Sequence, residues 1–298
     1  MKFVVQLHSQ QFSKTDGGLT VLLHIAKSLH EHGQDSWVRL PDNNYGYENN
    51  QLYTNYFNES QVDEDTTAIY IDCTLGNPLK AKRVVRFIGY GSHWYPGYDS
   101  NEIVYYHLPF CKLHVPTKTL RMMYLNPLAK NLNLPRSGGC CIIKKGIYDP
   151  SIRRLIADRR IDAIDLSGKS IEDVIHILNT TKYFYCYDPC CFLVIMALVC
   201  GCVVIQHPPT GYNQDEWQHA NGYDSVGRLN GVAFGFENLP HAEATVADAP
   251  EQCMKLVSRA DNDITSFIKD METGSYTYAP CYKFNESPYA FQFIDRRM

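Results

Sequence analysis

Asp188 is the residue whose type and position suit it most clearly to chemistry. It follows Tyr183–Tyr187, an aromatic run typical of a strand, and precedes the apolar stretches Cys190–Val199 and Cys200–Ile205. This order predicts strand, acidic loop, buried helix, glycine turn and strand, which is the core of a parallel α/β unit. Binding sites in such sheets lie beyond the carboxyl ends of the strands. The carboxylate of Asp188, a hydrogen-bond acceptor, is therefore placed in a candidate site.

Two glycine-containing segments could present backbone N–H groups and a cation to an anionic ligand. Gly17 and Gly18 belong to a predicted turn just before a helix, whose amino end attracts anions. Lys144, Lys145 and Gly146 follow a predicted strand in the second half. Strand alternation directs only one of the two lysines to the site, and we choose Lys145 because it adjoins the glycine. The glycines could instead close tight turns, and the lysines could lie on a solvated strand end.

The first half of the chain predicts a β-α-β opening that positions Gly17 and Gly18. An apolar strand over Phe3–Leu7, a helix over Leu19–His30 and a strand over Trp37–Leu40 follow from the periodicity. Further strands are expected over Ala68–Asp72 and Glu102–His107.

Between those two strands, the sequence predicts a helix over Gly76–Ile88. Pro78 suits a first helical turn, and Val84, Val85 and Ile88 would form the inward face. Arg83 and Arg86 would then lie on the solvated face.

The second half predicts another α/β domain. Pro127–Gly139 is rich in prolines, glycines and asparagines and is the best candidate linker. The elements expected beyond it are strands over Cys140–Ile143, Tyr183–Tyr187 and Val203–Gln206 and helices over Ile152–Arg159, Ile171–Leu178 and Leu256–Met271. We therefore expect an α/β protein with two Rossmann-like domains, residues 1–130 and 131–280, facing a central cleft, and a tail over 281–298 that can cross back to the first domain.

Composition limits the partners and the compartment. With 298 residues, of which 45% are apolar, the chain can form two cores. A net charge of -4 argues against nucleic acid as a partner and favours a small or neutral substrate. No segment has the roughly 18 apolar residues of a membrane span, and the amino end lacks the apolar run of a signal peptide. These features predict a soluble, cytoplasmic protein whose oligomeric state is undetermined.

The eleven cysteines are expected to be buried thiols. No Cys-x-x-Cys pair occurs, and Cys140, Cys141, Cys186, Cys200 and Cys202 fall within apolar strand or turn patterns. A zinc site would require distant side chains to converge.

The stretch from Asp188 to Val204 resembles the donor-binding signature of retaining, group 1-like glycosyltransferases with the GT-B fold. That signature has an acid, seven intervening residues and a second acid before a glycine turn. Asp188 falls on the first acid, whereas Met196 stands where the second acid is expected. The Gly17–Gly18 loop and the Lys145–Gly146 element are also similar to elements that meet the donor diphosphate in this superfamily. The segment Gly76–Arg86 looks like one found in transferases that build polysaccharides.

The resemblance implies a hexosyl- or pentosyltransferase that uses a nucleotide sugar, a glycan or polysaccharide acceptor, no cofactor and no metal. Cleavage of the anomeric bond leaves negative charge on the diphosphate. Lys145, Gly17, Gly18, Gly146 and the helix start after Pro189 would meet that charge. Asp188 would be the catalytic acid, binding sugar hydroxyls or stabilising the cationic transition state.

Other readings remain open. Asp188 could cap the helix that follows it, and Met196 belongs in a core. His107, after the strand over Glu102–His107, could contact a sugar or acceptor, although a lone histidine is more often structural. In the family that the sequence resembles, the second acid holds the ribose, and Met196 cannot accept those hydrogen bonds. A non-catalytic sugar-binding or assembly module with the same fold is therefore the alternative.

The sequence lacks the signatures of three other enzyme classes. No Gly-x-Gly-x-x-Gly follows the first strand, and no Gly-x-Ser-x-Gly occurs, which argues against a dinucleotide oxidoreductase and a serine hydrolase. The Asp-x-Asp of metal-dependent GT-A transferases is not found at the end of an apolar strand.

Overall fold

The computed structural model of the protein describes residues 1–13, 16–42, 46–50, 52–58, 61–89, 97–98, 101–108, 118–157, 162–209, 211–276, 278 and 282–283. The chain divides into two compact units, and each is described by itself. Unit 1 comprises residues 1–122 and 259–298, and unit 2 comprises residues 123–258. The first division therefore lies between 122 and 123, before the position expected from the sequence, between 130 and 131. Residues 259–280, which were expected in the second domain, belong to unit 1. The part of the predicted tail beyond residue 283 lies outside the described residues.

Unit 1 contains a six-stranded parallel sheet in the order β2-β1-β3-β4-β6-β7. Its strands are β1 (Lys2–Gln6), β2 (Asp35–Arg39), β3 (Thr66–Ile71), β4 (Arg83–Ile88), β6 (Glu102–Tyr106) and β7 (Lys118–Thr119). A short antiparallel pair joins β5 (Gly97–Tyr98) to β13 (Tyr282–Lys283). The helices are α1 (Gly17–Glu31), the single turn η1 (Tyr47–Asn49) and the carboxyl half of α7 (Ala249–Thr273).

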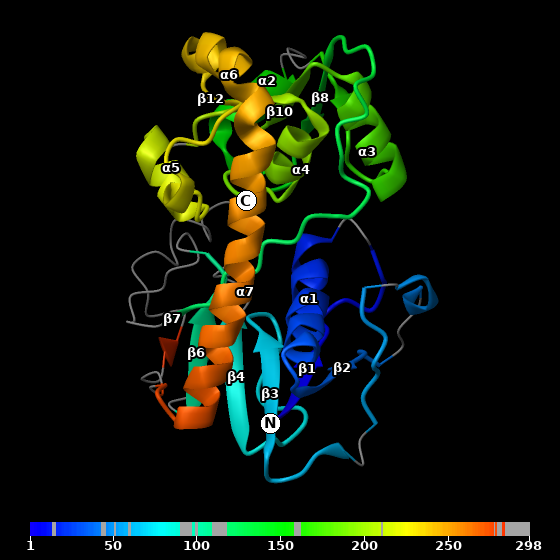
Figure 1. Cartoon of the computed structure of the whole chain (residues 1–298), viewed down its shortest axis with the longest axis vertical. Helices are drawn as coiled ribbons and strands as arrows, with labels where there is room; N and C mark the ends of the chain where they lie inside the picture. The colour runs from blue at the N-terminus through cyan, green and yellow to red at the C-terminus, as the bar shows by residue number, and fades with distance from the viewer. Residues whose placement is uncertain are drawn as a thin grey trace. The chain divides into compact units, whose positions relative to one another are not determined.

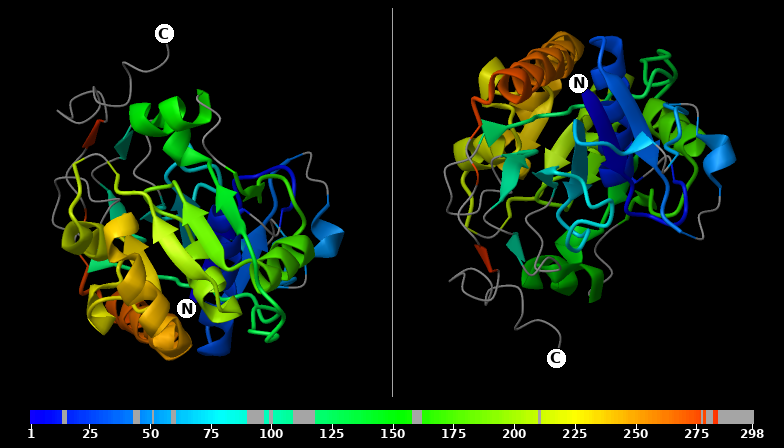
Figure 2. Two further views of the ribbon diagram at one scale, coloured as in Figure 1. Left: turned by 90° about the horizontal axis from the view of Figure 1, so that it is seen from above. Right: turned by 90° about the horizontal axis from the view of Figure 1, so that it is seen from below.

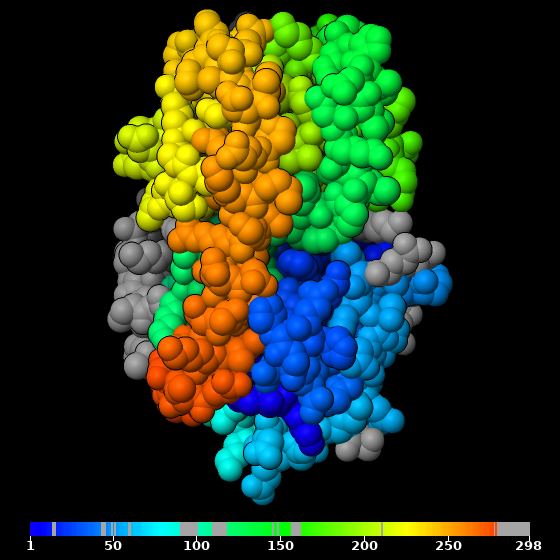
Figure 3. Space-filling view, in the orientation of Figure 1, coloured from blue at the N-terminus to red at the C-terminus, as the bar shows by residue number. Residues whose placement is uncertain are grey.

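Helices α1 and α7 cover one face of this sheet. Leu22 and Ile25 of α1 and Ile264 and Phe267 of α7 share one apolar core with Phe3 of β1. Figure 1 and the right view of Figure 2 show both helices on the same side of the strands, and Figure 3 shows them forming that surface of the unit. The apolar residues of α1 thus form one buried face of the helix, as their spacing predicts.

The predicted helix over Gly76–Ile88 is wrong. Residues 83–88 form strand β4, in which Val85 packs toward the α1–α7 core while Val84 packs on the opposite face. The valines and isoleucine matched helical spacing because a central parallel strand is apolar on both faces and shows no strict alternation. β-branched residues pack well on such a surface, which favours the strand.

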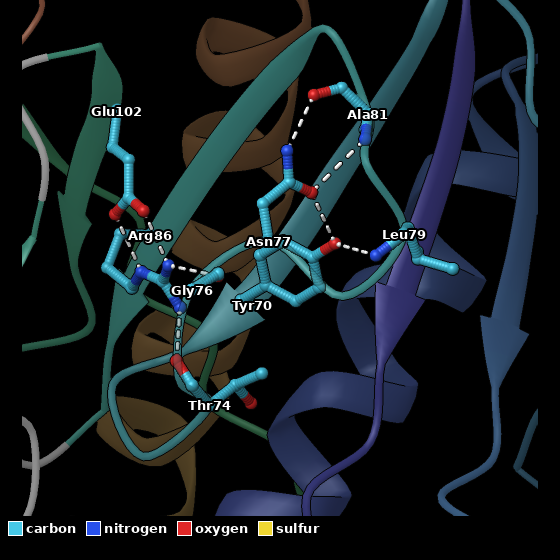
Figure 4. Close-up of polar contacts among 8 residues, drawn as sticks. All are labelled: Tyr70, Thr74, Gly76, Asn77, Leu79, Ala81, Arg86 and Glu102. Atoms are coloured by element: carbon cyan, nitrogen blue, oxygen red, sulfur yellow. Dashed lines mark hydrogen bonds and ion pairs between the residues drawn. The ribbon is translucent and has the colours of Figure 1, made fainter.

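Arg86 is buried rather than solvated, which corrects the second part of that prediction. Its Nε and Nη2 donate to the two carboxylate oxygens of Glu102 over 2.8 and 2.6 Å. Its remaining donors reach the carbonyl oxygens of Thr74 at 2.6 Å and Gly76 at 2.9 Å, and the guanidinium lies 5.2 Å from the ring centroid of Tyr70 (Figure 4). This network holds the segment between β3 and β4 against the second face of the sheet.

Unit 2 contains a five-stranded parallel sheet in the order β12-β11-β10-β8-β9. Its strands are β8 (Gly139–Ile142), β9 (Ile164–Asp165), β10 (Tyr183–Cys186), β11 (Val203–Gln206) and β12 (Val232–Phe234). Its helices are α2 (Pro150–Ala157), α3 (Ile171–Thr180), α4 (Leu193–Cys200), α5 (Gln214–Ala220), α6 (Leu239–Thr245) and the start of α7. Single turns are η4 (Lys145–Tyr148), η5 (Asp224–Val226), η6 (Phe236–Asn238) and η7 (Val246–Asp248).

Helix α4 is buried along its whole length. It ends at Gly201, whose φ of +93° is a left-handed conformation that favours glycine. Arg136 lies beside this end and donates to the carbonyl oxygens of Leu178 at 2.7 Å, Thr181 at 3.1 Å and Cys200. One guanidinium thus satisfies carbonyl groups at the ends of both α3 and α4.

The cysteines within the described ranges are all free, but the prediction of buried thiols holds only in part. Cys73 is exposed, and Cys190 and Cys191 are half-buried. Those that are buried as predicted are Cys140, Cys141, Cys186, Cys200, Cys202 and Cys253. Within the described ranges, no helix combines the length and the apolar composition needed to cross a lipid bilayer.

Candidate functional site

The carboxyl edge of the sheet in unit 2 brings together segments that are far apart in the sequence. The segments after β8, β10 and β11 meet there because these strands are parallel neighbours. They carry Lys144 and Gly146, then Asp188 and Pro189, and then His207. The predicted site residues of the second half therefore belong to one edge.

Asp188 holds the loop after β8. Its Oδ1 accepts hydrogen bonds from the backbone N–H of Lys144 and of Gly146, each at 2.8 Å. Asp188 is only 3% exposed. It does not cap the following helix, since α4 begins at Leu193 after Phe192. Its observed contacts are thus to the predicted diphosphate-binding loop, and its catalytic role stays a prediction.

Gly146 must be glycine for this loop to close. A Cβ atom at that position would lie 2.2 Å from the carbonyl oxygen of Tyr187 and 3.3 Å from Oδ1 of Asp188. The loop after β8 and the loop after β10 therefore touch backbone to backbone. This contact sets where the N–H groups of the loop point.

Pro189 is held in place by hydrogen bonds from residues in and just after α5. Its carbonyl oxygen accepts hydrogen bonds from Nε1 of Trp217 and Nδ2 of Asn221, each at 3.0 Å. Both donors are buried in or just after α5. The predicted helix start after Pro189 is therefore displaced by a turn to Leu193, and the intervening loop is held by α5.

Lys144 and Lys145 lie next to each other after β8. Lys144 is exposed, and its backbone N–H donates to Oδ1 of Asp188. Lys145 opens η4, and its side chain lies outside the described part of the structure. Its predicted contact with a diphosphate stays a prediction.

Ser151 and His207 form a polar chain that the sequence did not reveal. Ser151, in the first turn of α2, donates from Oγ to Oδ1 of Asp149 over 2.6 Å. Its Oγ also lies 3.1 Å from Nε2 of His207, directly after β11. The place of His207 in the sequence could have pointed to it, because His207 follows the predicted strand Val203–Gln206 just as Asp188 follows the strand before it.

His207 is half-buried, and this environment favours its neutral form. Burial lowers the pKa of His207 below its ordinary value, while the carboxylate of Asp149 opposes that shift. Its ring lies 5.8 Å from the ring of Tyr187, whose pKa burial raises to about 12. Tyr187 is therefore uncharged near neutrality, and the imidazole is well suited to hydrogen bonding without charge.

In unit 1, Gly17 and Gly18 form the first turn of α1. Asp16 caps this helix by accepting from the N–H of Leu19 at 3.0 Å. A Cβ on Gly18 would lie 3.4 Å from Cε1 of His8, so the glycine allows the imidazole to approach the helix start. The predicted contact of both glycines with a diphosphate stays a prediction.

His8 is a second residue that the sequence analysis did not single out. It lies just beyond β1, with Nε2 3.8 Å from Oδ2 of Asp16. Its Nδ1 is buried and has no hydrogen-bond partner among the described residues. A histidine beside a carboxylate can accept a proton from a hydroxyl group.

His107 is engaged in the core of unit 1. Its Nδ1 accepts from the N–H of Met122 at 3.4 Å, and its ring lies 5.6 Å from that of Phe87. These contacts are structural, and its predicted contact with a sugar or acceptor stays a prediction. Met196 is fully buried in the core of unit 2, which confirms its assignment as a core residue.

No metal-binding group of three or more histidine, cysteine, aspartate or glutamate residues is found in the described ranges.

Comparisons with known proteins agree on the fold. No protein-family model and no curated protein matches the sequence. Among solved structures, the DNA-modifying β-glucosyltransferase determined with and without uridine diphosphoglucose matches with a TM-score of 0.54 and 7% identity, over 91% of this chain and 100% of that chain. The β-glucosyltransferase of T4 phage matches with a TM-score of 0.53 and 7% identity, over 91% of this chain and 99% of that one. MurG of Acinetobacter baumannii has a TM-score of 0.38 and 11% identity, over 92% of this chain and 100% of its own.

At such low identity the likeness concerns the fold alone. The two parallel sheets with their helices match the GT-B architecture, which confirms the prediction of two Rossmann-like domains. The chain thus has the fold of glycosyltransferases that use nucleotide sugars.

Proposed function

We propose that this protein transfers a sugar from a nucleotide-sugar donor to a glycan or polysaccharide acceptor. One observation carries the proposal: the carboxyl edge of the sheet in unit 2 assembles Lys144, Gly146, Asp188 and His207 within a fold shared with UDP-sugar transferases. Ligands of open α/β sheets bind at this edge. The transferred group is a hexose or a pentose.

The donor diphosphate is expected at the loop after β8. Backbone N–H groups and lysines at such a loop can neutralise a leaving diphosphate without a metal ion. UDP is the first nucleotide to test, because the DNA-modifying β-glucosyltransferase of the same fold has uridine diphosphoglucose as its substrate. The resemblance to the group 1-like signature supports transfer with retention, and the composition supports a cytoplasmic location.

A non-catalytic sugar-binding or assembly module is the second candidate. It is favoured by the burial of Asp188, whose Oδ1 is already bonded to two backbone N–H groups, and by the core position of Met196. Such a module would bind a nucleotide sugar or a glycan and leave the anomeric bond intact.

A nucleotide-release assay separates the two candidates. The protein is incubated in EDTA with UDP-glucose, and with GDP-, ADP- and dTDP-linked sugars, in the presence and absence of oligosaccharide acceptors. Release of the nucleoside diphosphate that depends on the acceptor supports the transferase. A duplex DNA arm is included because the solved enzyme of this fold modifies DNA. Binding without release in every arm would contradict catalysis and support the module.

A further inference from the structure

We propose that His207 accepts a hydrogen bond from a sugar hydroxyl of the nucleotide-sugar donor through its Nδ1 atom. The inference rests on the proposed function and identifies a residue that recognises the sugar part of the donor. It is carried by the chain of hydrogen bonds from Asp149 through Ser151 to His207.

This chain fixes the tautomer of His207. Ser151 has one hydroxyl proton, which Oγ donates to the carboxylate of Asp149 over 2.6 Å. Oγ must therefore accept at its second contact, so Nε2 of His207, 3.1 Å away, carries the hydrogen and donates it. A neutral imidazole has one N–H, and Nδ1 is left as an acceptor.

Nδ1 is also available. Among the described residues, the hydrogen bond found for the ring of His207 is made by Nε2 and none by Nδ1, and the side chain is only half-buried. The ring is held between Ser151 of α2 and the ring of Tyr187 at 5.8 Å. A ligand that reaches this edge therefore meets a fixed acceptor rather than a mobile side chain.

The chemistry of an acceptor selects a hydroxyl rather than a phosphate. A lone pair repels phosphate oxygens, whereas each sugar hydroxyl can donate a hydrogen bond. His207 contacts the first turn of α2, which follows the Gly146 loop where the diphosphate is expected. The group next to a diphosphate in a nucleotide sugar is either the transferred sugar or the ribose. Met196 is buried in the core and cannot bind a sugar hydroxyl. His207 would provide a polar contact with one of these two sugars.

Calorimetric titration of wild type and His207→Phe distinguishes the sources. Phenylalanine keeps a ring against Tyr187 and removes both nitrogens. Loss of one such hydrogen bond is expected to weaken binding about 5- to 10-fold. A loss for UDP-glucose alone identifies the transferred sugar. A loss for both UDP and UDP-glucose, but not for 2′,3′-dideoxy-UDP, identifies the ribose.

His219→Phe is the matched control, because His219 lies exposed in α5 and pairs only with Asp224 among the described residues. It should bind all three ligands as the wild type does. Equal affinity of wild type and His207→Phe for UDP and UDP-glucose would overturn the inference, as would an equal loss for all three ligands. If wild type binds none of them, the proposed function itself fails and this inference falls with it.

A second readout tests the role of Ser151 as a positioning residue. Nitrogen NMR of the ligand-free protein should show His207 with its hydrogen on Nε2. Ser151→Ala removes the hydroxyl that selects this tautomer, so the spectrum should shift toward a mixture and the same ligands should bind more weakly. A wild-type spectrum with the hydrogen on Nδ1 would overturn the inference whatever the binding data show.

Discussion

At the scale of single residues, Asp188 and Gly146 shape the site through contacts with the backbone. Asp188 binds two N–H groups of the loop after β8, and Gly146 lets that loop touch the carbonyl of Tyr187. A carboxylate used in this way can be structural, catalytic or both. Isosteric and truncating variants separate these possibilities.

Asp188→Asn and Asp188→Ala should behave differently. An amide oxygen can still accept from Lys144 and Gly146, whereas alanine leaves these N–H groups unpaired at a cost of about 1–3 kcal/mol in the free energy of unfolding. We expect denaturant unfolding to show that loss for alanine only, while both variants lose sugar transfer because the charge is gone. Full activity of Asp188→Asn would reduce Asp188 to a loop-holding residue.

Lys145→Ala should weaken UDP binding more than Lys144→Ala and more than Asp188→Ala. Lys145 adjoins Gly146, and a cation beside a diphosphate forms a charge-assisted hydrogen bond worth about 1.5–3 kcal/mol, roughly 10- to 150-fold in affinity. Calorimetric titration gives the three affinities. Equal affinity of Lys145→Ala and wild type would remove Lys145 from the site.

The affinity for UDP-glucose should fall in acid because of His207. Burial lowers its pKa, so the imidazole is neutral at pH 7.5 and becomes protonated only below its ordinary value of 6.5. Protonation places a hydrogen on Nδ1 and converts the acceptor into a donor. Among the described residues, the groups facing the ring are Asp149, which opposes the shift, and the uncharged Ser151 and Tyr187.

Titrations between pH 5 and 8 test this dependence, with His207→Phe as the reference that corrects for other titrating groups. We expect the wild type to bind UDP-glucose more tightly than His207→Phe at pH 7.5 and to lose this difference in affinity below pH 6.5. Parallel profiles for the two proteins would exclude titration of His207 as the cause.

At the scale of elements, strand β4 shows what the sequence could not reveal. Its valines fit either a helix or a central strand, and in the structure Arg86 of this strand is buried against Glu102 of the neighbouring strand β6. That pairing depends on strand order, which periodicity does not contain. Periodicity therefore predicts a solvated Arg86, whereas this residue is the centre of a buried network.

Glu102→Ala should destabilise unit 1 by about 3–5 kcal/mol, because it leaves the buried Arg86 charge without its carboxylate. The matched control is Glu64→Ala, whose partner Lys82 is exposed at 3.8 Å and which should cost under about 1 kcal/mol. Denaturant unfolding followed by circular dichroism measures both. Similar losses for the two variants would show that the Arg86 network contributes little.

Elements with an unambiguous apolar pattern were predictable. β11 was predicted with its observed bounds because a glycine turn precedes its short apolar run. α1 and α3 were predicted to within two residues at each end because their apolar residues repeat at helical spacing. Asp188 could be placed at the carboxyl edge from the strand before it and the helix after it. Ser151 and His207 could not be joined, since 56 positions separate them and only the adjacency of β8, β10 and β11 brings them together.

At the scale of the whole molecule, the fold and the function rest on different observations. Each unit has its own parallel sheet and its own apolar core, and α7 contributes Leu256 to one core and Phe267 to the other. The likeness to β-glucosyltransferases extends over 91% of the chain at 7% identity and therefore concerns the arrangement of elements. The proposed donor specificity depends on a few residues at the edge of one sheet.

The most direct test of the account is a calorimetric titration of the wild-type chain with UDP and UDP-glucose in the presence of EDTA. The account predicts saturable binding of both ligands at one site per chain, with affinity that does not change when EDTA is replaced by magnesium. No heat and no thermal stabilisation from either ligand, for a protein that unfolds cooperatively, would contradict the assignment of the edge formed by Gly146, Asp188 and His207 as a UDP-sugar donor site.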